Sequence, residues 1–373
     1  MLYLKDMTTI VFFLPLLLIF TIFAVYGERK ISAFIQDRYG PMEVGKYGWY
    51  QTVADLLKLL QKEDIVAKNT SKILFLIAPV VIFVAIFAGF SVLPITSSWS
   101  GSFTETGVYF LIAIVSLDVV GIIMAGWGAN SKYTLLGALR SVAQIISYEV
   151  PVTLSIMCVI IITQSLNLQE ITYQQGILIN EFAGLENVKN YLFGISAMGI
   201  DVTNWGGFFS WNIVRAPVLI PVFLIYFIGT LAQSNRAPFD LPEEESELVG
   251  GFMTEYSGFR WAILMLSEYG MMLLVAILGV VLFFGGWNTI LPNIGAVTFA
   301  DWTTGAAGSI TGNMWSIFWL LTKAIFWVVV QIWVRWTFPR LRIDQLMNLS
   351  WKYLTPFALV LIFMTSFWRL LMI

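Results

Sequence analysis

The chain contains no histidine and only one cysteine, Cys158. Histidine-ligated haem, His or Cys zinc sites, iron-sulfur clusters and Ser-His-Asp triads all need residues that are missing, and one cysteine cannot form an internal disulfide. Charge is also scarce, since 12% of the residues are charged and the net charge is -2, which leaves no basic surface for nucleic acid. We expect no metal in this chain, and any metal centres of a surrounding redox system should lie in other subunits.

Hydrophobic residues dominate instead, at 58% of the 373 residues. This composition predicts an all-α integral membrane protein, in which each spanning helix needs about 20 mostly apolar residues. No internal repeat or low-complexity tract divides the chain, so we expect a single membrane domain over residues 1–373. About eight spans are predicted, at residues 7–27, 73–93, 107–128, 145–166, 212–233, 260–286, 313–337 and 353–372.

Basic residues are shared unevenly between the segments that connect these spans. Sixteen of the 21 lysines and arginines fall in one alternating set of connections, four fall in the other, and Lys323 lies inside a span. Connections rich in Lys and Arg stay on the cytoplasmic side of a membrane. The sequence therefore predicts a multi-pass protein with both termini on the far side, in a bacterial inner membrane rather than an organelle.

Two segments on the basic side have patterns of their own. Residues 48–62 place apolar and polar side chains on opposite helical faces, which predicts an amphipathic helix at the membrane interface. Residues 233–258 are acidic, and Asp240 followed by Glu243 resembles the first turn of a helix.

The acidic segment has two explanations. Acids in a first turn complement the helix dipole, and the pattern alone favours this explanation. Six acids beside a single arginine at a membrane could instead gather protons at the mouth of a path. The acids are Asp240, Glu243, Glu244, Glu245, Glu247 and Glu255.

Four ionisable residues lie within predicted spans: Asp118, Glu149, Glu268 and Lys323. Each costs at least about 2.5 kcal/mol in a membrane, so each is a functional candidate. They could form a chain of protonatable sites, or they could pair with other charges and fix helix packing. The first explanation is favoured for Glu149 and Glu268, and the second for Asp118 and Lys323.

Five longer segments carry a resemblance to a known family. They read ERKISAFIQDRYGP (28–41), ADLLKLLQKED (54–64), SKYTLLGALRSVAQIISYE (131–149), NRAPFDLPEEESELVGGFMTEYS (235–257) and PRLRIDQLM (339–347). Together they are similar to the H subunits of proton-pumping NADH-quinone oxidoreductase, which form the subunit 1 family of respiratory complex I. The resemblance covers nearly the whole chain.

The resemblance implies a membrane protein that helps to form a quinone chamber and couples quinone reduction to proton translocation. It implies quinone as the substrate, with FMN and iron-sulfur clusters held by hydrophilic partner subunits, and further partners in the membrane arm. The matching quinone-chamber or arm-contact positions are Arg29, Arg38, Asp55, Lys58, Arg140, Gln144, Arg236 and Phe239. The matching proton-coupling positions are Glu149, Asp240, Glu243, Glu245, Glu247, Glu255 and Glu268, and with them coupling becomes the preferred role of the acidic segment.

Three features depart from the family pattern. Gln233 stands where many relatives have a carboxylate, and it cannot titrate. Asp118 is an acid that many relatives lack, which suggests that the carboxylate has moved to a neighbouring helix. The connection 167–211 is longer than usual, and it could contact an extra subunit or be a lineage-specific insertion.

Two alternative functions remain at this stage. A homologous membrane subunit of ion-translocating hydrogenases shares the coupling acids, but the quinone-path motif near the N-terminus favours the quinone enzyme. An unrelated secondary transporter would also have about eight spans with buried charges. It would more often show repeated halves with broken helices, and neither feature is visible.

Overall fold

The computed structural model describes residues 2–102, 104–182, 190–195, 199, 201–240, 250–294 and 297–372, of which residues 2–10 are described by their backbone alone. In these ranges the protein is helical, with three isolated β-bridges and no extended strand. Seven segments are long and apolar enough to cross a membrane. The prediction of an all-α membrane protein is confirmed.

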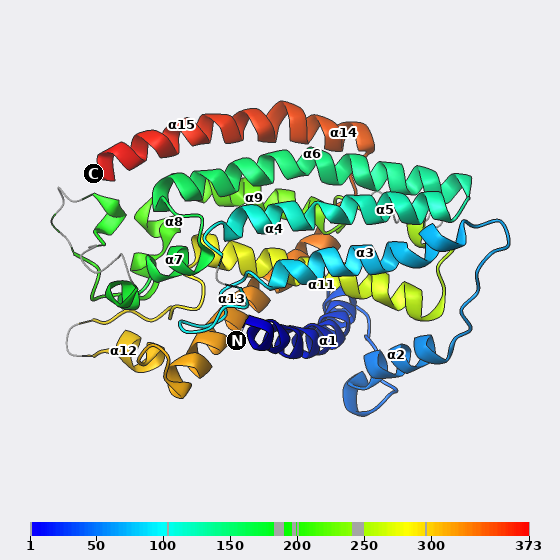
Figure 1. The fold of residues 1–373 in the computed structure, drawn as a ribbon, viewed down its shortest axis with the longest axis horizontal. Helices are drawn as coiled ribbons and strands as arrows, with labels where there is room; N and C mark the ends of the chain where they lie inside the picture. The colour runs from blue at the N-terminus through cyan, green and yellow to red at the C-terminus, as the bar shows by residue number, and fades with distance from the viewer. Residues whose placement is uncertain are drawn as a thin grey trace.

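The long segments are α1 (Leu2–Ile35), α3 (Lys72–Phe90), α4 with α5 (Gly107–Val115 and Leu117–Gly128), α6 (Lys132–Thr163), α11 (Gly258–Phe283), α13 (Ile310–Thr337), and α14 with η7 and α15 (Ile343–Asn348, Leu349–Leu354 and Thr355–Met372). Most of them run roughly side by side along the horizontal direction of Figure 1, whereas α1 and α13 cross this direction and contact each other and α11. The other helices that matter below are α2 (Gln51–Gln61), α7 (Leu168–Tyr173), α8 (Asn212–Arg215), α9 (Leu219–Gln233) and α12 (Phe299–Thr304).

Helix α11 forms the centre of the bundle. It contacts α1, α3, α9 and α13, and every residue from Tyr269 to Phe283 is buried. This run is apolar on all sides, as expected for a helix that is enclosed by other helices. The helices around it expose apolar side chains on their outer faces, as membrane-facing helices do.

Two helices differ from the predicted spans in a way that matters for the site. Helix α6 begins at Lys132, so Glu149 lies in its interior and not at its start. The span predicted at 212–233 is divided into α8 and α9, with Ala216 in an extended conformation before Pro217. A residue before proline avoids the helical conformation, which explains the break. The expectation of no broken helix is therefore wrong at this position.

The connections gather at two ends of the bundle. The α2 end, at the right of Figure 1, holds α2 and the short connections before α6, α11 and α14. The α8 end, at the left, holds α7, α8, α12 and the C-terminus. Helix α2 matches the predicted amphipathic helix and exposes Leu56, Leu57 and Leu60. The sixteen basic residues of the richer set belong to connections of the α2 end or to the adjoining helix ends.

Candidate functional site

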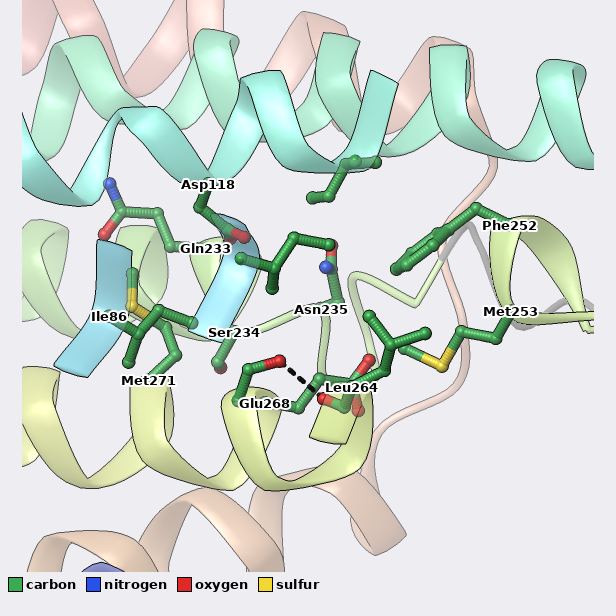
Figure 2. Close-up of a pocket in the computed structure, with 13 residues that line it drawn as sticks. Ile86, Asp118, Gln233, Ser234, Asn235, Phe252, Met253, Leu264, Glu268 and Met271 are labelled. Atoms are coloured by element: carbon green, nitrogen blue, oxygen red, sulfur yellow. Dashed lines mark hydrogen bonds between the residues drawn. The ribbon is translucent and has the colours of Figure 1, made fainter. Parts of the chain in front are cut away.

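A first cavity lies inside the bundle, between α3, α5, α11 and the end of α9. Figure 2 shows Asp118 on α5, Gln233 at the end of α9 and Glu268 on α11 around this cavity. It has room for a water molecule, and its walls carry enough polar groups to hold one. Asp118 is 7% exposed, and its Oδ1 atom has no hydrogen-bond partner. A buried carboxylate oxygen without a donor is costly, which marks Asp118 as a functional candidate.

A second cavity lies between α4, α6, α9 and α11. Its polar lining consists of Glu149, Thr153, Tyr226, Thr230 and Gln233, and the rest is apolar. Gln233 also lines the first cavity. Gln233 therefore borders both the cavity that holds Asp118 and Glu268 and the cavity that holds Glu149, as Met271 also does.

Glu149 contacts the start of α5, the helix that carries Asp118. The hydroxyl of Ser116, at the junction of α4 and α5, is in hydrogen-bonding contact with Oε1 of Glu149. Asp118 follows two residues later and faces the first cavity. The α4–α5 junction thus brings one acid to each of the two cavities.

A buried charge network lies at the α2 end and centres on Glu28 in α1. The Nη1 atom of Arg236 donates to both carboxylate oxygens of Glu28, at 3.3 and 3.2 Å, and Arg335 of α13 forms a second ion pair with it. The Tyr269 hydroxyl of α11 donates to Oε2 at 2.6 Å, and the Arg236 guanidinium lies 4.4 Å from the Tyr269 ring centre. Glu28 and Arg236 are both buried.

The negative charge of Glu28 keeps its partner Arg236 in the charged form. Burial alone would lower the pKa of Arg236, but the neighbouring Glu28 carboxylate outweighs burial and raises the pKa of Arg236 above its ordinary value. Arg236 is therefore charged at all physiological pH values. Its Nε and Nη2 atoms are buried and have no hydrogen-bond partner in the described part of the chain, so they could donate to a further group.

The remaining predicted chamber and arm-contact residues fall into two groups. Arg29 forms an ion pair with Asp55 of α2 at 2.5 Å, while Arg38 and Lys58 are exposed at the same end. Arg140 is half-buried on α6. Gln144 and Phe239 lie inside the protein instead: the Gln144 amide donates to the backbone oxygens of Ala232 (2.7 Å) and Phe239 (2.6 Å).

The predicted coupling acids outside the cavities are only partly described. Asp240 is buried and lies 3.5 Å from Nη2 of Arg340, and Glu255 is half-buried. Glu243, Glu245 and Glu247 lie outside the described residues.

Lys323 lies apart from both cavities. Its Nζ atom donates to the backbone oxygens of Phe284 and Asn288, each at 2.8 Å, just beyond the end of α11. The Nζ atom is also 5.1 Å from the ring centre of Trp211. These contacts support the packing role for Lys323, because a cation complements the carbonyl end of a helix.

In the described part of the chain, no group of three or more His, Cys, Asp or Glu side chains could hold a metal ion. What the arrangement offers is a set of buried acids, hydroxyls and an amide around water-sized cavities, next to a buried ionic network. Such a set can take up, hold and pass protons.

Sequence reasoning missed Glu28 as a site residue and took it for part of the boundary after the first span. A signal was present, because α1 continues to Ile35 and buries Phe13, Leu17 and Ala24 on one face. Glu28 follows Ala24 by four residues and so continues that face. Extending the apolar periodicity beyond residue 27 would have identified it.

Comparison with known proteins finds relatives that all belong to one family. The family described as NADH dehydrogenase matches residues 7–366. H subunit 2 of the NADH-quinone oxidoreductase of Cytophaga hutchinsonii is 57% identical, over 97% of this chain and 98% of the relative. The H subunit of the same enzyme of Chlorobium luteolum is 47% identical over 93% of this chain and 84% of the relative, and that of Geobacillus sp. is 41% identical over 94% and 89%.

Proposed function

We propose a function from one premise: this chain belongs to the NADH dehydrogenase family, among the H subunits of NADH-quinone oxidoreductase. It is a multi-pass membrane subunit of that enzyme complex in bacteria. Its specific task, in our proposal, is to form one wall of the quinone chamber at the α2 end and to couple quinone reduction to proton movement through the two cavities. Family membership leaves no place for the unrelated transporter.

The observation that carries the proposal is that Gln233 borders both cavities. A glutamine amide cannot titrate, but it donates and accepts hydrogen bonds and can hold a water molecule on each side. Asp118 supplies the titratable group that Gln233 lacks, on the same cavity. We infer a relay in which Glu268 and Asp118 exchange protons with Glu149 along water molecules, and the Gln233 amide holds these molecules in place by hydrogen bonds.

Communication with the quinone chamber would run through Arg236. This residue follows Gln233 by three positions and is held by Glu28 and Tyr269. Quinone reduction consumes two electrons and two protons, so the charge next to the network changes during each turnover. A change of charge there shifts the proton affinity of coupled acids nearby, which would drive the relay.

The exposed residues of the α2 end take the partner roles in this proposal. Arg29, Arg38, Asp55 and Lys58 face the hydrophilic subunits that hold FMN and the iron-sulfur clusters and oxidise NADH. Asp240, Glu243, Glu245, Glu247 and Glu255 supply protons to Glu268 in this proposal. Identifying the subunits that co-purify with the chain would distinguish this quinone enzyme from a hydrogenase assembly.

The relay is tested by Asp118→Asn in the assembled complex. We expect reduction of an artificial acceptor by NADH to be retained. The proton-to-electron ratio in inside-out vesicles should fall clearly below that of the unmodified complex, because an asparagine amide cannot take up and release the proton that Asp118 would carry. Gln233→Glu should be tolerated, because it adds a further titratable group to the cavity that already holds Asp118 and Glu268.

Asp301→Asn is the matched control. Asp301 is exposed on α12, at the α8 end, and lines neither cavity, so this variant should pump normally. An unchanged proton-to-electron ratio in Asp118→Asn would exclude Asp118 from the relay.

A further inference from the structure

The α8 end contains a buried arginine, Arg215, that has no counter-ion among the residues that the structure describes. Arg215, the last residue of α8, is 8% exposed, and its Nε and Nη1 atoms have no hydrogen-bond partner. No carboxylate in the described ranges forms an ion pair with it. A buried charge without a partner is strongly unfavourable, so this site is incomplete as it stands.

A second arginine lies at the same place. Arg369 is half-buried in the last turn of α15, and its Nε atom is also buried without a partner. The end of α15 is joined to α8 through residues 192–194: a Cβ atom at Gly194 would collide with the Met372 side chain, and this segment contacts α8. Figure 1 shows the C-terminus beside this part of the molecule.

The two guanidinium groups repel each other across this contact. Burial, followed by the positive charge of Arg369, lowers the pKa of Arg215 to about 10. Arg215 is therefore still charged at neutral pH. Two like charges are held together at low exposure, and an anion between them would remove both the repulsion and the unpartnered donors.

The neighbouring surface of α15 indicates what kind of anion fits. Phe363, Phe367 and Leu370 follow helical spacing along one face of α15 and are 77%, 64% and 69% exposed, and this face lies about a third of a turn around the helix from Arg369. A site with a charged head and an apolar stripe along a membrane helix matches a phospholipid, whose phosphate suits the planar fork of arginine.

We propose that Arg215 and Arg369 form a binding site for a phosphate group at the α8 end, and that the bound molecule is an anionic phospholipid whose acyl chains lie along Phe363, Phe367 and Leu370. The lipid would tie α8 to the end of α15 and so brace the break between α8 and α9. The proposal does not depend on the proton relay.

The test uses the intact complex, purified in mild detergent, delipidated and then incubated with phosphatidylglycerol, phosphatidylcholine or inorganic phosphate. Bound lipid is counted by native mass spectrometry. We expect the complex to retain phosphatidylglycerol, and retention to fall about tenfold in Arg215→Gln and in Arg369→Gln, because each substitution removes charge-assisted hydrogen bonds.

Lys352→Gln is the matched control, since Lys352 is an exposed basic residue just before α15, at the opposite end of the bundle. It should retain as much phosphatidylglycerol as the unmodified complex. Heat inactivation provides a second readout: phosphatidylglycerol should protect the unmodified complex and should fail to protect the two arginine variants.

Three outcomes would overturn the proposal. Equal retention of phosphatidylglycerol by the arginine variants would show that the lipid binds elsewhere. Equal protection by phosphatidylcholine would show that charge is not recognised. Protection by inorganic phosphate but not by phosphatidylglycerol would assign the arginines to a soluble anion and exclude the lipid. If a variant does not assemble, Arg215→Lys and Arg369→Lys retain the charge and keep the comparison possible.

Discussion

Buried ionisable residues in this protein fall into two kinds at the residue scale. Glu28 and Lys323 have several partners at hydrogen-bonding distance: Glu28 has them in the segment after α9 and in helices α11 and α13, and Lys323 has them in the backbone beyond α11. Asp118 and Arg215 are equally buried but have atoms with no partner. The first kind fixes the arrangement of helices, and the second kind leaves groups that a proton, a water molecule or a ligand can satisfy.

Glu28→Gln should destabilise the assembled protein by about 3 kcal/mol, since removing one member of a buried ion pair leaves an uncompensated charge. Here Arg236 and Arg335 would both lose their carboxylate. The effect is measured as a lower midpoint of heat inactivation and less complex in the membrane. Glu63→Gln is the control because Glu63 is exposed, and it should leave both unchanged. Equal stability of the two variants would contradict this account of Glu28.

At the scale of secondary-structure elements, the close contact between α6 and residues 251–253 requires a glycine at position 137. A Cβ atom at Gly137 of α6 would lie 2.8 Å from Cα of Gly251 and 3.0 Å from its carbonyl carbon. Backbone atoms cannot move aside as side chains do. Helix α6 and residues 251–253 therefore need Gly137 to remain in contact, just beside the acidic segment.

Gly137→Ala should cost about 1–3 kcal/mol through overpacking. Gly27→Ala is a matched helical substitution with no atom within 4 Å of the new Cβ, and alanine is favoured over glycine in a helix by about 0.5–1 kcal/mol. Heat inactivation of the complex should therefore occur at a lower temperature for Gly137→Ala and at an unchanged or higher temperature for Gly27→Ala. The opposite order would show that α6 can shift to accommodate the methyl group.

The sequence predicted the helices better than it predicted their limits. Charge-free windows located the spans, because the membrane requires about 20 apolar residues in each. The same rule stopped the first span before Glu28 and started the fourth at 145, although α1 and α6 continue through charged residues that find partners at the α2 end. Pro217 was visible in the sequence, but the sequence did not show whether this proline would break the apolar run at 212–233 or be accommodated in a continuous helix.

The orientation in the membrane is a property of the whole molecule. The uneven distribution of Lys and Arg predicts the α2 end on the cytoplasmic side and the α8 end on the periplasmic side. Lys68 is exposed at the first end and Asp301 at the second. The single natural cysteine, Cys158, is fully buried and should not react with reagents that stay in water.

Cysteine substitutions at these two positions test the orientation. With a maleimide that cannot cross membranes, Asp301→Cys should be labelled in spheroplasts, and Lys68→Cys only in inside-out vesicles. Labelling of both after detergent treatment shows that each thiol is reactive. Labelling of Lys68→Cys in spheroplasts would reverse the predicted orientation.

The candidate site was predictable in its parts but not in its arrangement. Asp118, Glu149 and Glu268 were identified because charges are rare in apolar windows. That Gln233 faces two cavities depends on how α3, α5, α6, α9 and α11 pack, and one sequence contains no signal for such contacts. Arg215 was counted only as a basic residue on the far side, since its burial follows from the packing of α8 against residues 192–194 and α11.

The Glu28 network also sets an order of events during synthesis. Glu28 is separated by 208 residues from Arg236 and by 307 residues from Arg335. At roughly 5–20 residues per second, α1 emerges from the ribosome some 15 to 60 seconds before its second arginine exists. Until Arg236 has been made, the Glu28 carboxylate lies at the edge of the bilayer with neither of these arginines, and until Arg335 has been made it can pair with only one of them. Closure of the bundle around Glu28 is therefore a late step that only a nearly complete chain can take, and truncated chains should remain open to membrane proteases.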